Sequence, residues 1–230
     1  MSLAVRATDL RELMDDPDCD PDRLAATLRR FDLVNRAIGG WGRVWRRHLA
    51  SALGSLGRPA RVLDVGSGGG DVVARLAELA ERDGLEVEWL GIDPDPRALA
   101  VAQERARPGV SFACTDAAGL AATGARFDAV LSNHVLHHLS DAELPGFIAE
   151  TTALSSGPVL HADIARGRLP YALYGVGITA LERGTFLRTD GLRSIRRSYR
   201  PDELQRTLGP RWRVVSPVPF RLLAIGDGGA

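Results

Sequence analysis

One stretch decides the fold, and it reads Arg61-Val62-Leu63-Asp64-Val65-Gly66-Ser67-Gly68-Gly69-Gly70-Asp71. An apolar strand pattern ends in an acid, four glycines follow within five residues, and a helical pattern begins at once. Glycine lets the backbone turn sharply and approach a ligand that a Cβ would exclude. The stretch therefore predicts a nucleotide-like cofactor at a strand-to-helix turn.

The pattern on both sides of this stretch predicts an α/β fold. Strands are expected at 60–65, 86–92, 110–114, 127–132 and 157–162, with helices at 70–82, 96–107 and 141–154 between them. Such alternation is typical of a parallel sheet with crossover helices. Two further strands, 212–216 and 220–225, flank Pro217 and Pro219 and are expected to form an antiparallel pair at a sheet edge. The remaining expected helices are 3–14, 22–33, 41–53, 169–181 and 201–208, and the arginine-rich segment 183–198 is expected to be irregular.

Composition excludes several function classes. The 230 residues are 45% hydrophobic and 25% charged, which is ordinary for a globular protein. Twenty-nine basic residues, all arginine, balance 29 acidic ones, so nothing indicates binding to nucleic acid or to an anionic membrane. The missing lysines exclude Schiff-base chemistry. Cys19 and Cys114 are too few for a disulfide framework or a zinc site. A cytoplasmic location is expected because no leader or long apolar run is present.

The spacing of the glycines narrows the choice of cofactor class. A dinucleotide-binding turn requires G-x-G-x-x-G, but the sixth position counted from Gly66 is Asp71. Asp64 precedes the first glycine by two residues and would repel a pyrophosphate. An acid at this place favours a cofactor that carries positive charge there.

Four segments in order resemble the class I S-adenosylmethionine-dependent methyltransferases. They are the first-motif stretch 63–70, the second-strand end Leu90-Gly91-Ile92-Asp93, the third-strand end Cys114-Thr115-Asp116-Ala117 and the fourth strand Phe127-Asp128-Ala129-Val130-Leu131-Ser132-Asn133. The resemblance implies a Rossmann-like, seven-stranded, mostly parallel sheet with an antiparallel C-terminal strand, helices on both faces and an N-terminal helical lid. It also implies S-adenosylmethionine as the cofactor.

The same resemblance implies the cofactor-binding residues. Asp93 would accept hydrogen bonds from the ribose hydroxyls and Asp116 from the adenine amino group, and an ionised carboxylate is the right acceptor for both. The full set is Asp64, Gly66, Ser67, Gly68, Asp93, Pro94, Asp116, Ala117 and Asn133.

The segment after the fourth strand holds three of the five histidines. Its run Val135-Leu136-His137-His138-Leu139-Ser140-Asp141 resembles the Leu-His-Asp-Trp-Ser-Asp run of plant phenol O-methyltransferases, in which the histidine is the general base. His137 is therefore the expected base and His138 the second candidate, although His138-Leu139 replaces Asp-Trp. Histidines that only cap or pack a helix are the alternative. No metal is expected, because the pattern places no acidic or sulfur ligand beside the histidines except the nearby Asp141.

The substrate side is expected in the flanks of the chain. Residues 1–58 form an N-terminal helical cap, and 59–230 form the methyltransferase domain with a substrate-side insertion at 166–200. The candidate substrate contacts are Trp41, His134, Tyr171 and Arg166, of which Arg166 would anchor an acidic or carbonyl-bearing acceptor. The cap helices and 166–198 also offer a surface for a homodimer.

Segments in these flanks resemble bacterial methyltransferases associated with type III polyketide, phenolic and quinone metabolites. They are Asn35-Arg36-Ala37-Ile38-Gly39-Gly40, Asp163-Ile164-Ala165-Arg166, 190–197 and Pro201-Asp202-Glu203-Leu204. The resemblance implies a small phenolic acceptor in secondary metabolism such as antibiotic biosynthesis. C-methylation of a quinone or aromatic ring, a dinucleotide oxidoreductase and a non-catalytic cofactor-binding protein remain alternatives. The fourth strand is followed by Ser-Asn-His-Val and not by Asn/Asp-Pro-Pro-Tyr/Phe, which argues against a nucleic-acid substrate.

Overall fold

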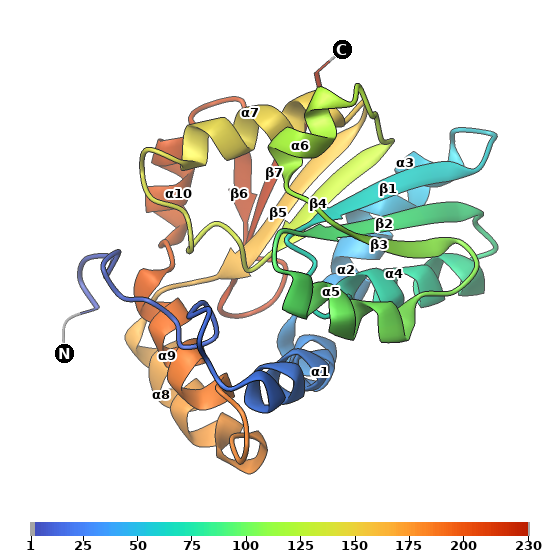
Figure 1. Ribbon diagram of the computed structural model, residues 1–230. Helices are drawn as coiled ribbons and strands as arrows, with labels where there is room; N and C mark the ends of the chain where they lie inside the picture. The colour runs from blue at the N-terminus through green and yellow to red at the C-terminus, as the bar shows by residue number, and fades with distance from the viewer. Residues whose placement is uncertain (1–2, 230) are drawn as a thin grey trace.

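A computed structural model describes residues 3–229 of the chain and contains one seven-stranded sheet (Figure 1). The strand order is β3-β2-β1-β4-β5-β7-β6, in which β1 to β5 run parallel and β7 pairs antiparallel with β5 and β6. The strands are β1 (Ala60–Val65), β2 (Val87–Asp93), β3 (Val110–Cys114), β4 (Ala129–Asn133), β5 (Pro158–Ile164), β6 (Arg213–Val215) and β7 (Arg221–Asp227). This confirms the predicted fold class, including the antiparallel pair that closes the sheet.

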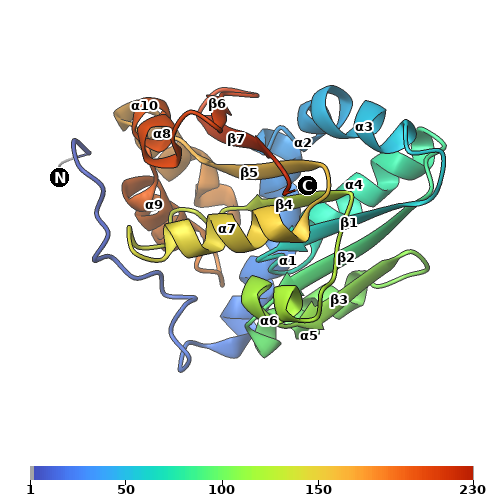
Figure 2. The same cartoon turned by 90° about the horizontal axis from the view of Figure 1, so that it is seen from above.

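Helices cover both faces of the sheet. They are α1 (Pro21–Ile38), α2 (Trp41–Val44), the π-helical turn η1 (Trp45–Leu49), α3 (Ala50–Gly54), α4 (Asp71–Arg82), α5 (Pro96–Ala102), η2 (Gln103–Arg105), α6 (Ala117–Ala122), α7 (Leu144–Leu154), α8 (Arg168–Gly177), η3 (Ile178–Leu181), α9 (Leu187–Arg197) and α10 (Pro201–Leu208). Figure 2 shows α3 and α4 on one side of the sheet and α7 on the other. No helix in the described part of the chain is long and apolar enough to span a membrane.

Alternating strand residues explain the two layers. Val62 and Leu131 point to the face that packs against α2, η1 and α4, whereas their neighbours Leu63 and Val130 pack with residues of α7 and α10 on the opposite face. All four side chains are fully buried. Because both faces are covered, the central strands are continuous apolar runs.

Two predictions about the flanks were wrong, and a third was confirmed with one irregularity. Residues 3–14 form turns, bends and irregular backbone and no helix. The helix expected at 41–53 is confirmed over residues 41–54, but its middle turn is the π-helical η1, in which Trp45 and Leu49 are fully buried. The segment expected to be irregular forms α9, whose arginines lie beside a buried face that includes Leu187 and Ile195. The helix α9 packs with few apolar side chains because it also buries Asp190 and Arg197, which hydrogen-bond to Leu13 and to His137.

The N-terminal segment 3–20, α1, α8 and α9 lie together below the sheet in Figure 1. The Leu13 and Met14 amides donate hydrogen bonds of 2.8 and 3.0 Å to the Asp190 carboxylate of α9. The Phe186 amide donates 2.8 Å to Thr27 Oγ1 of α1. Leu28 of α1 lies against Gly68 and Gly69. These contacts bring the sequence-distant flanks over the glycine turn at the end of β1.

Candidate active site

The glycine turn between β1 and α4 adopts a conformation that only glycine tolerates well. Gly66, Gly68 and Gly70 have φ of 72°, 51° and 75°. A Cβ on Gly66 would lie 2.5 Å from Val135 Cγ2, and one on Gly70 would lie 2.5 Å from the Phe112 ring. Conformation and close packing therefore both require glycine at positions 66 and 70, whereas at Gly68 the conformation alone favours it.

The turn is bound to the end of β2. The Gly68 amide donates to Asp93 Oδ2 at 2.9 Å, and the Asp95 amide donates to Asp93 Oδ1, also at 2.9 Å. Ser67 is buried, and its carbonyl accepts 2.8 Å from the Gly70 amide. Asp93 thus lies beside the turn, where the sequence predicted a cofactor.

Asp64 is the most unusual carboxylate of the site. It is 1% exposed, and its Oδ1 has no hydrogen-bond partner among the described residues. Burial, followed by the charges of Asp71 and Asp93, raises the pKa of Asp64 well above its ordinary value. Burial also raises the pKa values of Asp71 and Asp93, although Asn35 Nδ2 donates 2.8 Å to Asp71. Three neighbouring acids, of which Asp64 has an oxygen with no hydrogen-bond partner among the described residues, favour a cation at this place.

The other predicted cofactor residues lie at neighbouring strand ends. Asp116 follows β3, is exposed, and caps α6 by accepting 2.7 Å from the Gly119 amide, while Ala117 behind it is buried. Pro94 follows β2 and is exposed. Asn133 ends β4, and its Oδ1 accepts 2.6 Å from Arg221. Because carboxyl ends of parallel strands meet at one sheet edge, these residues share one edge with the glycine turn.

His134 is held in a strained backbone conformation beside Asn133. Its φ is 64°, unusual for a residue with a Cβ. Arg221 donates 2.6 Å to His134 Nε2, which fixes a neutral imidazole as the acceptor. Burial, then the Arg221 charge, lowers the pKa of His134 well below its ordinary value. His134 is therefore a neutral ring at physiological pH.

His137 forms a buried pair with Asp163 from the end of β5. Its Nδ1 lies 2.7 Å from Asp163 Oδ1, its amide donates 2.9 Å to Asp163 Oδ2, and both residues are at most 2% exposed. Burial alone would lower the pKa of His137, but the charges and hydrogen bonds of Asp163 and Glu12 outweigh it and raise the pKa to about 9. The pKa of Asp163 falls below its ordinary range despite burial, because His137 is charged.

Glu12 is the unexpected member of the site. The N-terminal segment places its Oε1 3.3 Å from His137 Nε2, and Ser194 donates 2.7 Å to the same oxygen. Burial raises the pKa of Glu12, but the His137 hydrogen bond and the charges of His138 and His137 lower it more. Glu12 is 5% exposed, so the segment holds an ionised carboxylate inside the protein.

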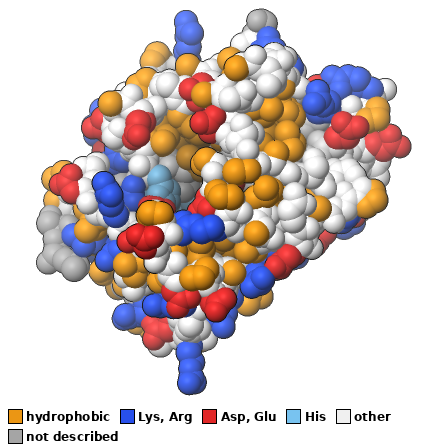
Figure 3. Space-filling view, in the orientation of Figure 1, with side chains coloured by type: hydrophobic (Ala, Val, Ile, Leu, Met, Phe, Trp, Pro, Cys, Tyr) orange, Lys and Arg blue, Asp and Glu red, His pale blue; other side chains and the backbone are white. Residues whose placement is uncertain are grey.

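His138 lies at the rim of this cluster. Its Nδ1 is 3.3 Å from Asp15 Oδ2 and its Nε2 is 3.8 Å from Glu12 Oε1. Arg197 donates 3.2 and 3.1 Å to the backbone oxygens of His137 and His138. In Figure 3, histidine atoms are visible in a hollow of this face, with arginine and acidic side chains around it.

The fold also assembles groups with the donor atoms of a metal site. The ligand atoms of Glu12, His137 and His138 lie within 4.8 Å of one another, and so do those of His134, His137 and Asp163. The sequence pattern did not reveal these acids, because they come from 125 residues before and 26 residues after His137. Arg197 Nη1, 4.0 Å from Glu12, adds positive charge that disfavours a cation in the first group.

Two predicted substrate contacts have other partners. Arg166 is buried, and its Nε, Nη1 and Nη2 donate to Ser198, to Leu3 and to the Glu203 carboxylate. The three nitrogens thus join the end of α9, the N-terminal segment and α10, so the guanidinium is occupied by contacts within the protein. Trp41 is 3% exposed and lies in the core of the α4 face. Tyr171 is half-buried in the first turn of α8.

The sequence reasoning missed Glu12, Asp163 and Arg221 as members of the histidine cluster. Asp163 had a signal, since it directly follows the expected strand 157–162. Arg221 lies near the start of the expected strand 220–225, but only the fold shows that this strand pairs antiparallel with β5 and so brings Arg221 opposite Ile164, beside Asp163. Nothing in the local pattern around Glu12 distinguishes it from a surface acid.

The chain is similar in sequence to known methyltransferases. Residues 62–155 match the family described as "Methyltransferase domain". A ubiquinone biosynthesis O-methyltransferase of Azorhizobium caulinodans is 36% identical over 176 residues, covering 72% of this chain and 66% of that protein. A demethylmenaquinone methyltransferase of Deinococcus radiodurans is 37% identical over 113 residues, covering 47% and 45%. The chain spans about half the length of the first curated relatives it matches.

The fold is shared with solved methyltransferase structures. The plantazolicin methyltransferase BpumL in complex with SAH superposes with a TM-score of 0.59 at 12% identity, covering 91% of this chain and 95% of that one. Magnesium protoporphyrin IX methyltransferase from Synechocystis PCC 6803 with bound SAH has a TM-score of 0.53 at 18% identity, covering 88% and 93%.

The residues fit the cofactor that this fold family uses. S-adenosylmethionine carries a sulfonium and an ammonium group, and the buried Oδ1 of Asp64, which has no hydrogen-bond partner among the described residues, suits a positively charged group. Asp93 and the left-handed glycine turn lie beside it. Sheet order, glycine turn, strand-end acids and the matched domain agree: the chain belongs to the class I S-adenosylmethionine-dependent methyltransferases.

Proposed function

We propose that this protein transfers a methyl group from S-adenosylmethionine to the hydroxyl oxygen of a small phenolic or hydroxyquinone acceptor. The observation that carries this proposal is the buried His137–Asp163 pair, whose His137 Nε2 faces away from Asp163 and has no well-aligned hydrogen bond. A histidine oriented by a carboxylate at one nitrogen suits proton removal from a hydroxyl at the other nitrogen, once Glu12 has moved away from it. The curated relatives named as ubiquinone biosynthesis O-methyltransferases support an oxygen acceptor on such a ring.

S-adenosylmethionine, when bound, would supply a methyl group on a sulfonium: an acceptor oxygen forms the new bond to the methyl carbon in line as the carbon–sulfur bond breaks, and S-adenosylhomocysteine is the leaving group. The glycine turn, Asp64 and Asp93 would hold and orient the cofactor at the strand ends. Asp163 holds the His137 ring with Nδ1–H toward itself, which leaves Nε2 to receive the acceptor proton. His134, kept neutral by Arg221, lies beside this pair.

Glu12 must leave His137 Nε2 before the histidine can act. While the carboxylate is 3.3 Å away, a pKa of about 9 keeps His137 protonated at neutral pH. An acceptor hydroxyl that replaces Glu12 removes this stabilising negative charge, so the pKa of His137 falls toward the range of a useful base. Glu12 lies in a segment without helix or strand, which favours such a displacement.

Methylation of a ring carbon is the second candidate. The protonated state of His137 favours it, because a hydroquinone that is already ionised needs no base. The relative named demethylmenaquinone methyltransferase supports a quinone ring as acceptor. A phenolic acceptor of polyketide origin is a third form of the same proposal, and it rests on the flanking segments alone.

The deciding experiment incubates the purified protein with S-adenosylmethionine and a panel of catechols, alkylresorcinols and hydroxyquinones. We expect a mass gain of one methylene group and a product whose methyl carbon has the NMR shift of a methoxy group. A methyl carbon bonded to ring carbon would favour the second candidate. Cofactor binding without turnover of any of these acceptors would contradict the proposal.

A further inference from the structure

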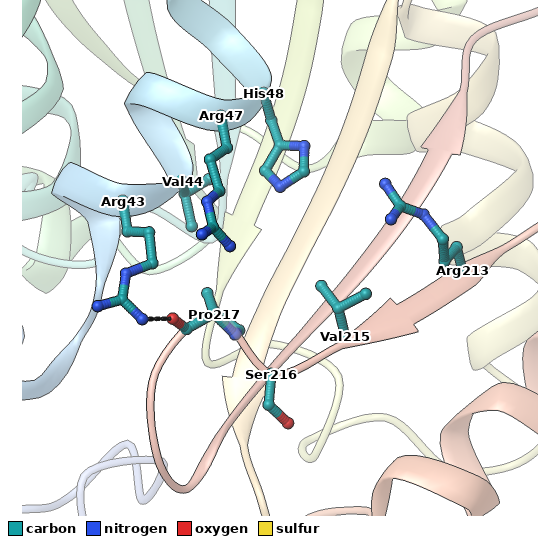
Figure 4. A pocket seen from close by; sticks show the side chains of 8 residues that line it. All are labelled: Arg43, Val44, Arg47, His48, Arg213, Val215, Ser216 and Pro217. Carbon is teal, nitrogen blue, oxygen red and sulfur yellow. Dashed lines mark hydrogen bonds between the residues drawn. The ribbon is translucent and has the colours of Figure 1, made fainter.

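A second concave site lies apart from the methyl-transfer site, between the π-helical turn η1 and the edge strand β6. The cleft has a volume of about 360 Å³ and shares no lining residue with the histidine cluster. Figure 4 shows Arg47 and His48 pointing into it from the helix and Arg213 from the strand opposite. Its volume falls in the range of small-molecule sites, roughly 300–1,000 Å³.

The lining is strongly cationic and uncompensated. It contains Arg43, Arg47, Arg213 and His48 but no carboxylate. Within residues 3–229 no acid forms an ion pair with any of these three arginines, whereas Arg36 contacts both Asp32 and Glu78. In a chain whose acidic and basic residues balance at 29 each, such a cluster is a local excess of charge.

Backbone contacts leave most of the donors available. Arg43 Nη1 donates 2.6 Å to the Pro217 carbonyl, which holds that guanidinium at the mouth of the cleft. The side chains of Arg47 and Arg213 have no hydrogen bond or ion pair within the described chain, and both are exposed on opposite walls. Ser216 adds a hydroxyl to the lining.

The pKa of His48 depends on the positive charges around the cleft. Burial, followed by the charges of Arg213 and Arg47, lowers the pKa of its imidazole. Both arginines therefore act on one point from two elements, and a bound anion would reverse their effect on the imidazole.

We propose that this cleft binds a small molecule through a phosphate group. Guanidinium groups on opposite walls present planar pairs of donors that match the several oxygens of a phosphate dianion better than a single carboxylate. The volume exceeds that of a bare phosphate ion, so the ligand carries a second phosphate or a small organic body beside the phosphoryl group. The π-helical turn buries Trp45 and Leu49 in the core, and the same turn places Arg47 and His48 in the lining of the cleft. π-helical turns occur frequently at functional sites.

The test titrates the intact protein with inorganic diphosphate by calorimetry at constant ionic strength, with acetate as the comparison anion. Arg47→Gln and Arg213→Gln should each weaken diphosphate binding roughly tenfold or more, the loss expected for one charge-assisted bidentate contact. Arg46→Gln is the matched control, because Arg46 is the exposed neighbour on the same turn but does not line the cleft. It should change the affinity less than about twofold.

A second readout follows His48 by NMR. Diphosphate should raise the His48 pKa in the wild type, and Arg213→Gln should raise it without ligand. The proposal fails if diphosphate does not bind at millimolar concentration, if acetate binds equally well, or if Arg46→Gln weakens binding as much as Arg47→Gln. Binding of S-adenosylhomocysteine in every variant checks that the fold is retained and keeps the result separate from that for methyl transfer.

Discussion

His137 Nδ1 lies 2.7 Å from Asp163 Oδ1, and the pair joins the loop after β4 to the end of β5. The two strands are parallel neighbours, so their carboxyl ends fix the ring and the carboxylate in one orientation. Asp163 also accepts hydrogen bonds from the amides of His137 and Ile164. A carboxylate held at these three contacts, one of them with the imidazole itself, leaves the ring little freedom except proton exchange at Nε2.

Replacement of this histidine tests its role directly. His137→Ala should lower turnover by roughly 10²–10⁴-fold, the usual contribution of a general base. Affinity for S-adenosylhomocysteine, measured by calorimetry, should stay within about threefold, because the acids that we propose hold the cofactor, Asp64 and Asp93, lie on other strands. His138→Ala is the matched comparison: the His138 side chain is 31% exposed, lies 3.3 Å from Asp15 and 3.8 Å from Glu12, and packs on the His137 ring without a carboxylate that orients it from the buried side, so activity should fall only a few-fold. Equal losses in the two variants would reject the assignment.

Glu12 should control the pH dependence of the reaction. Glu12→Gln removes a negative charge from the side of His137 Nε2, which destabilises the imidazolium and lowers its pKa from about 9. Activity requires the neutral ring, so the ascending limb of kcat/KM against pH should move to lower pH in this variant. Asp15→Asn is the control, because Asp15 contacts His138 and lies farther from the base. A limb that stays in place would show that Glu12 does not influence the base.

The pH dependence of stability follows from the same pair. The pKa of His137 is raised from 6.5 to about 9 on folding, so its contribution is complete below pH 6.5 and is lost as pH rises through 9. The loss is on the order of 3 kcal/mol, since each pKa unit corresponds to ~1.4 kcal/mol. Chemical denaturation of wild type and His137→Gln at pH 6.5 and 9.5 measures it. The wild type should lose stability over this range, and the variant should lose clearly less.

The buried acid before the glycine turn should have opposite effects on stability and on cofactor binding. Asp64→Asn removes a carboxylate that is costly to ionise at neutral pH, where its raised folded-state pKa opposes folding. The melting temperature without cofactor should therefore rise. Affinity for S-adenosylmethionine should fall at least tenfold, because the cationic cofactor loses its counter-charge. A variant that binds the cofactor as well as the wild type would contradict the cationic site.

The sequence predicted those site residues that lie within one short motif. It did not predict site residues that come together from distant parts of the chain. Asp64, Gly66 and Asp93 could be placed because two short motifs, the glycine turn after the first strand and the acid that ends the second strand, each lie within a few consecutive residues. Glu12 could not, since it reaches His137 only through contacts such as the Asp190 carboxylate with the Leu13 and Met14 amides.

The arginines show the same limit of sequence reasoning. Arg166 was expected to bind a substrate, but its guanidinium donates hydrogen bonds to Leu3, Ser198 and Glu203. Arg221 was not among the expected site residues, but it donates hydrogen bonds to Asn133 and His134. Which arginine is free is decided by tertiary pairing, which leaves no local pattern.

The glycine turn itself can be tested with a matched pair of substitutions. Gly66→Ala meets two penalties, a φ of 72° and a collision of its Cβ with Val135 Cγ2 at 2.5 Å. Gly57→Ala meets only the first, because its φ is 66° and nothing lies within 4 Å of the added Cβ. Gly57→Ala should cost about 1 kcal/mol of stability and leave cofactor affinity unchanged. Gly66→Ala should cost more and weaken S-adenosylhomocysteine binding at least tenfold, since Val135 and the turn must separate where the cofactor lies. Adding Val135→Ala to Gly66→Ala removes the collision and should restore part of the affinity, and a double variant no better than Gly66→Ala would mean that backbone conformation alone makes the glycine necessary.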